Sequence, residues 1–183
     1  DSRVSAARVD VVDANSLDDF CSRCSIIVNC AGPVMVLQDR VAQAAFRKRC
    51  HYVDAAGLLI VKQRMLPRDR EIADLGLSFV ISAGLLPGIR ELLPLYAYAQ
   101  AKAKMDTIES LSIYYGDTGE WSGNAFREIA WMIRQRRSGG PGHMAPGYFR
   151  KGEWVKLSML TSHTADLGGR IGQRRFYPGF IPE

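Results

Sequence analysis

The first half of the chain alternates short apolar runs with segments of helical periodicity, and this alternation constrains the fold more than any other feature. Four runs have the length and composition of buried strands: residues 8–12, 25–30, 51–54 and 77–83. Three segments between them place apolar residues at helical spacing: 16–23, 37–50 and 67–76. Strands and helices that alternate in this way predict a parallel sheet covered by helices on both faces, which is a doubly wound α/β fold.

Small residues follow three consecutive predicted strands. The stretch "NCAGP" ends at Pro33, "DAAG" ends at Gly57 and "SAGLLPG" ends at Gly88. In open parallel sheets, ligands bind outside the carboxyl ends of the strands. A glycine at such a place lets a ligand approach the backbone because no Cβ stands in the way. These three breaks therefore predict a ligand crevice along one edge of the sheet.

The pattern changes after Gly88, and we place a domain boundary there, between residues 1–88 and 89–183. The second part is expected to contain both helices and antiparallel strands, which makes it an α+β unit. Its expected elements are helices at 89–104 and 124–137, a half-exposed strand at 109–116 and a hairpin strand at 150–158. The composition of residues 138–147 predicts a loop, and residues 168–183 show no evident element.

The charge pattern favours a solvated surface over a nucleic-acid partner. The formal net charge is +5 with a pI near 9.2, but the lysines and arginines are scattered along the chain. No apolar run reaches the ~18 residues that a membrane span needs, and the first ten residues lack the pattern of a signal peptide. We therefore expect a cytoplasmic protein with no membrane and no nucleic-acid partner.

All four cysteines lie in the first third of the chain. Cys21 and Cys24 form a C-x-x-C, and Cys30 and Cys50 follow predicted elements. A structural zinc site needs four ligands, and no second pair stands at a suitable spacing. We interpret the cysteines as reduced thiols and expect no metal.

Three blocks carry a resemblance to a known family. In their order and spacing, residues 9–33, 51–57 and 83–89 resemble the saccharopine dehydrogenase-like family of NAD(P)-dependent oxidoreductases. Three later stretches resemble the start of the second, substrate-and-dimerisation domain of that family: residues 112–133, 148–157 and 174–183. The resemblance implies a Rossmann-like first domain. No strand followed by G-x-G-x-x-G occurs in the chain, so the resemblance places the first β-α-β unit and its phosphate loop before Asp1.

The resemblance implies NADP or NAD as cofactor, bound across the three strand ends. The residues that it places at the cofactor are Asp13, Cys30, Ala31, Gly32, Pro33, Gly84, Pro87 and Gly88. Two alternatives stay open at this point. Asp13 is equally suited to starting a helix near Ser16, and "AGP" could form an ordinary turn between a strand and a helix.

The implied reaction is hydride transfer to or from a C–N or C–O centre of a small, carboxylate-bearing substrate, in a homodimer. Arg170, Arg174 and Arg175 are candidates to bind the carboxylate, with solvated surface arginines as the alternative. Tyr52 and Asp54 share one face of their predicted strand, so they are the candidate catalytic pair for moving a proton. The alternative is that Tyr52 packs under a helix while Asp54 caps the next turn. The alternating stretch 109–116 suggests the sheet that meets a second subunit.

Two competing functions remain open. In a short-chain dehydrogenase/reductase, Tyr98 and Lys102 would form the Tyr-x-x-x-Lys pair after "NCAG", but Leu85 stands where that family has a serine, and Ser82 is the nearest one. A packed aromatic side chain is the simpler interpretation of Tyr98. The other candidate is an α/β scaffold without catalytic activity that acts through protein contacts.

Overall fold

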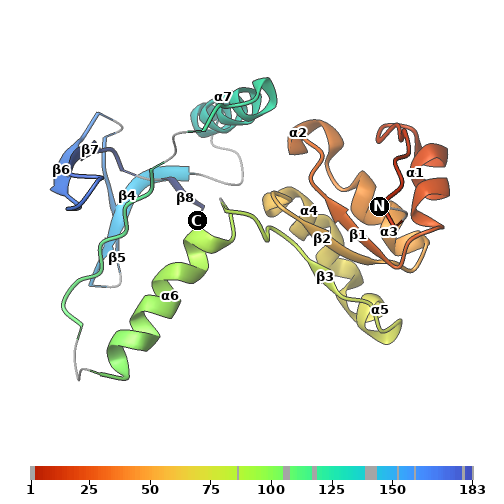
Figure 1. Cartoon of the computed structure of the whole chain (residues 1–183), viewed down its shortest axis with the longest axis horizontal. Helices are drawn as coiled ribbons and strands as arrows, with labels where there is room; N and C mark the ends of the chain where they lie inside the picture. Colours follow the sequence, from red (N-terminus) through yellow and green to blue (C-terminus); the bar gives the residue numbers. More distant parts are fainter. Residues whose placement is uncertain are drawn as a thin grey trace. The chain divides into compact units, whose positions relative to one another are not determined.

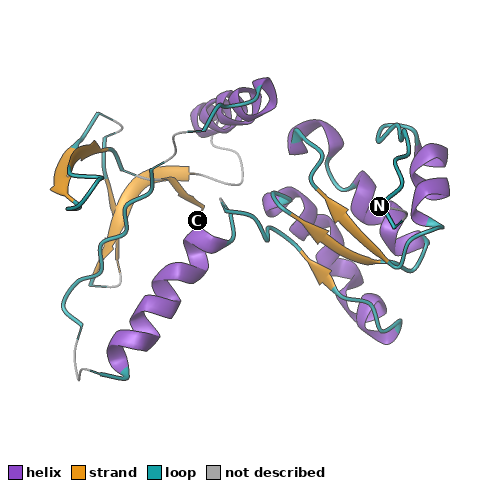
Figure 2. Cartoon of the chain, viewed as in Figure 1, coloured by secondary structure: helices purple, strands orange, loops and turns teal. Residues whose placement is uncertain are grey.

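A computed structural model describes residues 3–85, 87–104, 108–116, 119–138, 144–151, 153–158, 160–178 and 180–182. The chain divides into two compact units, Asp1–Ile113 and Tyr114–Glu183. Figures 1 and 2 show the elements of each unit. The division falls at Ile113, whereas the sequence predicts a domain boundary at Gly88. The assignment of the stretch between these two positions to a substrate domain stays a prediction.

A three-stranded parallel sheet organises the first unit (Figure 1). Its order is β1 (Ile26–Asn29), β2 (His51–Asp54) and β3 (Phe79–Val80). Helices connect and follow the strands: α1 (Ala14–Cys21), α2 (Val34–Leu37), α3 (Arg40–Arg47), α4 (Leu58–Met65), the 3-10 helix η1 (Leu66–Arg68), α5 (Asp69–Asp74) and α6 (Ile89–Lys102). The parallel sheet and its alternating helices confirm the α/β class.

Only one face of the sheet is buried in the described chain. Ile27, Tyr52 and Phe79 stand in register across the three strands, and they pack into a single core. On the opposite face, the side chains of Ile26 and Val28 are 57% and 67% exposed. Among the described residues the second face of the sheet is therefore open, because the apolar run of β1 alternates between a covered and an open face. Coverage of both faces by helices stays a prediction.

Small side chains on α3 let this helix lie close to β1 and β2. Ala42, Ala44 and Ala45 are fully buried, and Val41 and Phe46 border them in the same core. Helical spacing of these residues predicted this face correctly. Close packing of α3 fixes the position of this helix on β1 and β2, since buried alanines leave no room for the helix to shift.

The strand expected at residues 8–12 does not form. Asp10 makes a turn instead, in which its Oδ1 accepts a hydrogen bond from the Val12 N–H (2.9 Å) and its C=O accepts one from the Asp13 N–H (3.2 Å). Helix α1 then starts at Ala14, earlier than the expected start at Ser16, because Asp13 Oδ1 accepts from the Asn15 N–H (3.0 Å). Short acidic side chains compete with a strand partner for backbone N–H groups, which explains the difference.

Two helices follow β2 where one was expected. The sequence predicts a helix at 67–76, and the structure adds α4 just before it. The stretch "LLIV" at the start of α4 is a continuous apolar run, so its periodicity does not distinguish a helix from a strand. Gly76 ends the second helical segment with a φ of +68°, as expected for a C-terminal glycine.

Helix α6 is the longest helix of the first unit. Gly88 precedes it with a φ of +127°, and the Gly88 N–H donates to Glu91 Oε2 (2.6 Å). Pro94 lies inside the helix. In the described part of the chain, no helix is both long enough and apolar enough to cross a bilayer.

The second unit contains one helix and two small antiparallel sheets. Its elements are α7 (Gly123–Ser138), β4 (Met144–Arg150), β5 (Glu153–Lys156), β6 (His163–Asp166), β7 (Gln173–Phe176) and β8 (Phe180–Pro182). The strand orders are β5-β4-β8 and β6-β7. The helix at 124–137 and the hairpin strand at 150–158 are therefore confirmed.

Other expectations for the later part of the chain were wrong. Residues 109–116 form no strand among those described; Tyr114 instead packs its ring against Phe176 (4.5 Å between centroids) and contacts His163 Nε2 through its hydroxyl (3.1 Å). Aromatic packing of this kind needs no ladder of backbone hydrogen bonds. β4 begins inside the expected loop, whose residues 139–143 lie outside the described chain, and β7 and β8 form in the terminal stretch because each finds an antiparallel partner.

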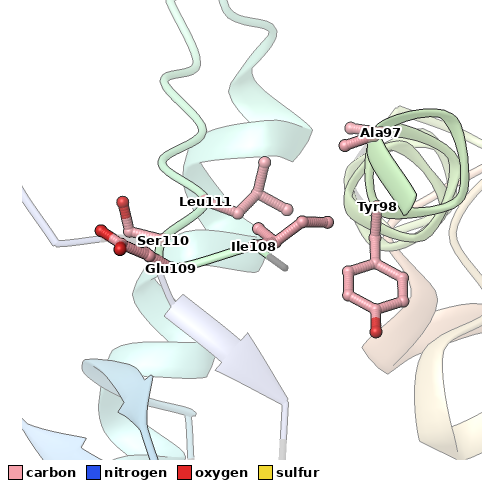
Figure 3. Close-up of a pocket in the computed structure, with 7 residues that line it drawn as sticks. Ala97, Tyr98, Ile108, Glu109, Ser110 and Leu111 are labelled. Carbon is pink, nitrogen blue, oxygen red and sulfur yellow. The ribbon is translucent and has the colours of Figure 1, made fainter. Parts of the chain in front are cut away.

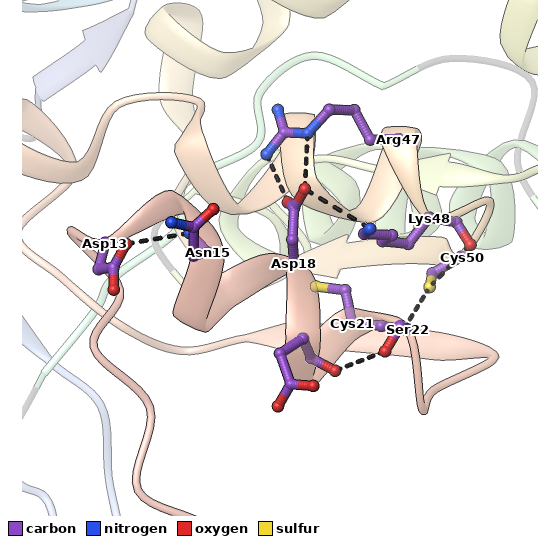
Figure 4. A network of polar contacts seen from close by, with 9 residues as sticks. Asp13, Asn15, Asp18, Cys21, Ser22, Arg47, Lys48 and Cys50 are labelled. Carbon is purple, nitrogen blue, oxygen red and sulfur yellow. Dashed lines mark hydrogen bonds and ion pairs between the residues drawn. The ribbon is translucent and has the colours of Figure 1, made fainter.

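One carboxylate ties α1 to α3 (Figure 4). Asp18 Oδ1 accepts from Arg47 Nη2 (2.6 Å), Asp18 Oδ2 accepts from Arg47 Nε (3.3 Å), and Lys48 Nζ lies 3.7 Å from Oδ2. The hydrogen bond from Arg47 lowers the pKa of Asp18 below its usual 3.8.

Protonation of Asp18 should weaken this tie. A carboxylate whose pKa is lowered by folding stabilises the protein above its unfolded-state pKa, and this contribution is lost as the pH falls through the folded-state pKa. We expect Asp18→Asn to lower the free energy of unfolding by about 0.2–1 kcal/mol at pH 7. The difference from the wild type should shrink below about pH 4. Urea unfolding at both pH values measures it, and an equal difference at neutral and acid pH would contradict the assignment.

Candidate functional site

The carboxyl ends of the three parallel strands are joined to one another by backbone hydrogen bonds. The Ala55 N–H donates to the Asn29 C=O (3.3 Å), which joins the end of β2 to the end of β1. The Ala83 N–H donates to the Asp54 C=O (2.8 Å), which joins the chain after β3 to the end of β2. The segments that follow the strands therefore form one edge, and we call them the strand-end loops: residues 30–33, 55–57 and 82–84.

A buried carboxylate lies behind these loops. The Asp54 side chain is on the buried face of the sheet, and the residue is only 2% exposed. Its Oδ1 accepts hydrogen bonds from the Gly57 N–H (2.5 Å) and the Ser82 N–H (2.8 Å). Its Oδ2 is also buried and has no hydrogen-bond partner among the described residues. An unpartnered buried oxygen in an otherwise well-bonded carboxylate marks this position as a candidate site.

Two glycines allow the loops to close around this carboxylate. A Cβ at residue 57 would collide with both carboxylate oxygens of Asp54. A Cβ at residue 84 would collide with the Ala55 C=O. The loops after β2 and β3 therefore approach each other more closely than any side chain would permit.

Backbone strain is concentrated at the same place. Ser82 has a φ of +66° and Leu58 a φ of +52°, in the left-handed region that residues with a side chain seldom adopt. The Leu58 N–H donates to Ser82 Oγ (3.0 Å), so the two strained residues hold each other. Strained backbone persists where the surrounding structure fixes it, and it gathers at functional sites.

The Tyr52 side chain lies deep in the interior beside Asp54. The residue is completely buried, its ring contacts that of Phe79 (5.3 Å between centroids), and its hydroxyl accepts a hydrogen bond from Asn29 Nδ2 (3.1 Å). Burial raises the pKa of Tyr52, and the nearby Asp54 charge raises it further. The hydroxyl therefore keeps its proton at neutral pH.

The predicted cofactor residues occupy two positions along the strand-end loops. Cys30, Ala31 and Gly32 are exposed at the end of β1, while Pro33 is buried at the start of α2 and follows a cis peptide bond. Gly84, Pro87 and Gly88 form the passage from β3 into α6, where the backbone of Gly84 bridges to Gly88. Both groups thus lie on chain that continues directly from a strand end.

Asp13 takes up the helix-starting role that was its alternative. It is exposed and caps α1 through its hydrogen bond to the Asn15 N–H. A contact of Asp13 with a cofactor stays a prediction.

The predicted catalytic pair is brought together on the buried face. Tyr52 and Asp54 share this face, as the two-residue period of a strand requires, and neither side chain reaches the surface. The capping alternative describes the contacts of Asp54 well, because its carboxylate binds the N–H at the start of α4. A catalytic role for either residue stays a prediction.

The three arginines expected at a substrate carboxylate lie in and beside the β6-β7 hairpin of the second unit. All three are exposed. Arg174 and Arg175 are neighbours in β7, so their side chains leave on opposite faces of the strand. Arg174 also donates to the Gln173 C=O (2.8 Å). Arg170 lies in the turn between the strands, and the structure does not bring the three together on one face.

Tyr98 and Lys102, the pair of the competing interpretation, do meet on α6. Lys102 Nζ lies 6.0 Å from the centre of the Tyr98 ring, which is a contact with the ring face. Tyr98 is 48% exposed and borders a groove of about 440 Å³ (Figure 3). Ile108 and Leu111 point into this groove towards α6, while Glu109 and Ser110 point away. The interpretation of Tyr98 as an aromatic side chain packed in the core was wrong, because the residue is about half exposed. The Lys102 ammonium group lies over its ring.

The cysteines are free thiols in the structure. Cys50 Sγ donates to the C=O of Cys21 (3.2 Å) and of Cys24 (3.1 Å). Figure 4 shows Cys50 near Cys21, the last residue of α1. Burial raises the pKa of Cys21 to about 11 and raises that of Cys50 as well. These thiols therefore stay protonated at neutral pH. Within the described ranges, no three acidic, histidine or cysteine side chains gather as a metal site would require.

The sequence did not reveal the roles of three residues of this site. Asn29 links the end of β1 to Tyr52, Gly57 admits the Asp54 carboxylate, and Ser82 supplies a backbone N–H to it. Asn29 carried a usable signal, since a polar residue stood at the end of an apolar strand. The role of Ser82 depends on a contact between distant segments and had no local signal.

Comparisons with known proteins support the resemblance seen in the sequence. No protein-family model matches the chain. A probable mitochondrial saccharopine dehydrogenase-like oxidoreductase of Arabidopsis thaliana is 30% identical over 82 residues, which are 45% of this chain and 18% of that protein. Among solved structures, saccharopine dehydrogenase (L-Glu forming) from Saccharomyces cerevisiae matches with a TM-score of 0.45 and 19% identity, over 56% of this chain and 22% of that one. The similarity to the Arabidopsis saccharopine dehydrogenase-like oxidoreductase is distant, and the matched part of the chain spans less than a quarter of either protein.

Substitution of Gly57 tests the close packing at the Asp54 carboxylate. We expect Gly57→Ala to lower the free energy of unfolding by about 1–3 kcal/mol, because the added Cβ forces the carboxylate away from its donors. Gly116→Ala is the matched control, since a Cβ there meets nothing within 4 Å. Urea unfolding of both variants gives the comparison. Equal midpoints for the two variants would show that the carboxylate does not need this glycine.

Proposed function

We propose that the chain is part of an NAD(P)-dependent oxidoreductase of the saccharopine dehydrogenase-like type. The observation that carries the proposal is the joined edge of three parallel strand ends, where glycines bring the backbone of one loop against the next. Ligands of open α/β sheets bind at such an edge. The distant similarity to the Arabidopsis oxidoreductase supports the same class of reaction.

The exposed face of the sheet supports a Rossmann-type arrangement. Parallel sheets are normally covered on both faces, yet Ile26, Val28 and Val80 are each about half exposed or more. β1 is also the outermost strand in the order β1-β2-β3. We infer that this sheet is one portion of a doubly wound sheet whose further elements cover the open face.

The strand-end loops fit a dinucleotide by their shape. Cys30, Ala31 and Gly32 present exposed backbone and small side chains at the end of β1, so a flat ring could lie against them. NADP or NAD, when bound, would supply or accept the hydride. The loops would orient the cofactor at the carboxyl edge of the sheet, and the packing of α2 over Pro33 would hold the first loop in place.

The proposed substrate is a small molecule that carries a carboxylate and a reducible C=N or C=O bond. Reduction adds a hydride to the carbon, and the nitrogen or oxygen must gain a proton from an acid. Tyr52 keeps its proton at neutral pH but is buried, so we propose that it and Asp54 support the site from behind the loops. The homodimer stays a prediction, since the strand expected to form the subunit interface is not present at 109–116. The cytoplasmic location also stays a prediction.

Dinucleotide binding tests the proposed function directly. We expect NADPH or NADH, titrated into the full-length protein in a calorimeter, to bind, and Gly32→Val to weaken the affinity about tenfold or more, because the new side chain occupies the approach to the backbone. Gly116→Val serves as the control, since open space surrounds that position. Circular dichroism would check that both variants keep their helical content.

Two results would contradict the proposal. One is the absence of binding heat for both dinucleotides with the wild-type full-length protein. The other is an affinity that Gly32→Val leaves equal to that of the control.

A further inference from the structure

We propose that Asn29 is a positioning residue, which together with Tyr52 and Asp54 forms a buried polar bridge that holds the three strand-end loops in one arrangement. The polar bridge crosses β1 and β2 on the covered face of the sheet and ends at the loop after β3. Its purpose, a crevice kept ready for a dinucleotide, rests on the proposed function. Its existence does not, and the experiment below separates the two.

The side-chain amide of Asn29 is fixed at both ends. Its Nδ2 donates to the Tyr52 hydroxyl (3.1 Å), and its Oδ1 accepts from the Ala31 N–H (3.0 Å). A flipped amide would set its two N–H groups against the N–H of Ala31, so only one orientation satisfies both contacts. Asn29 thus connects a buried hydroxyl to the backbone of the exposed loop at the end of β1.

The Tyr52 hydroxyl has a proton left to donate. Because its oxygen accepts from Asn29 and burial keeps the group protonated, the hydroxyl proton must find an acceptor elsewhere. Asp54 lies two residues along the same face of β2, and its Oδ2 is a buried acceptor with no other partner in the described structure. We infer that the hydroxyl proton of Tyr52 turns towards this oxygen. The raised pKa of Tyr52 reflects its burial first, and the contribution of Asp54 to that shift agrees with this arrangement.

The other oxygen of Asp54 completes the polar bridge. Oδ1 accepts from the Gly57 N–H and from the Ser82 N–H, which belong to the loops after β2 and β3. Ser82 in turn accepts from the Leu58 N–H and so fixes the start of α4. Once the inferred bond from the Tyr52 hydroxyl to Asp54 Oδ2 is formed, a continuous path of polar contacts runs from Ala31 through the three bridge residues to the backbone of both other loops.

A buried network of linked polar groups resists partial opening. When one member is lost, its former partners stay buried without a hydrogen bond. The free-energy cost is then larger than that of one lost hydrogen bond. Movement of the first loop should therefore be coupled to movement of the other two. Neither Tyr52 nor Asp54 needs to touch a substrate for this, which agrees with their burial.

Hydrogen exchange of individual backbone amides tests the polar bridge without any ligand. We expect Tyr52→Phe to accelerate exchange at Ala31, Gly57 and Ser82 together by about tenfold, the factor that corresponds to the loss of one hydrogen bond of ordinary net strength. Ile27→Val is the matched control, because Ile27 stands beside Tyr52 in register on the same buried face but makes no polar link. In the control, any change in exchange at these three amides should be no larger than the change that its loss of global stability causes across the core.

Asn29→Ala provides a second variant in case Tyr52→Phe does not fold. Asn29 is only partly buried, and it touches neither Gly57 nor Ser82. Faster exchange at these two distant amides would support the polar bridge. Acceleration confined to Ala31 would overturn it, because each loop would then be held separately.

Dinucleotide titration of the same variants separates the inference from the proposed function. If the wild type binds NADPH or NADH and the variants accelerate all three amides, affinity should fall about tenfold in the variants as well, while Ile27→Val binds normally. If the wild type does not bind, the proposed function fails and the exchange data still decide whether the polar bridge exists. Unchanged exchange with normal binding would overturn the inference and leave the proposed function standing.

Discussion

The arrangement of the strand ends depends on two hydrogen bonds that the Asp54 carboxylate accepts from backbone N–H groups. A charged group is costly to bury unless hydrogen bonds compensate it, and Gly57 and Ser82 supply these bonds to Oδ1. The first donor reaches the carboxylate only because residue 57 has no Cβ. The second belongs to a residue held in the left-handed region. One side chain thus fixes the loops after β2 and β3, and it explains why a glycine and a strained serine stand there.

Among the described residues, helices pack on the same face of the sheet that carries Asp54. α3 approaches β1 and β2 through buried alanines, whereas Ile26 and Val28 leave the opposite face exposed. The apolar character of both faces is a property of the sequence, but coverage depends on which elements are present to pack against them. Under the proposed fold, the open face is a surface made for further helices, and the apolar residues there need no function of their own.

Sequence periodicity predicted the parts of the fold in which local pattern and tertiary packing agree. β1, β2, β3, α3 and α7 were found in this way, and the shared face of Tyr52 and Asp54 followed from the alternation of side chains in a strand. The strands expected at 8–12 and 109–116 failed because alternation cannot show whether a partner strand is available. For the site, the sequence indicated the three loops. It could not show that Asp54 faces inwards, because burial and the donor from Ser82 arise only when distant segments meet.

The division between surface and interior decides what kind of site this edge can form. The exposed part, Cys30 to Gly32, offers backbone and small side chains, while the groups able to hold or donate protons lie behind it. Such a surface suits a ligand that brings its own reactive group, since a bound cofactor needs position and shape more than acid or base from the protein. The buried groups then act by keeping the loops in register. Under the proposed function, selectivity for a substrate would come from side chains outside the strand-end loops, because these loops present little that distinguishes one small acid from another.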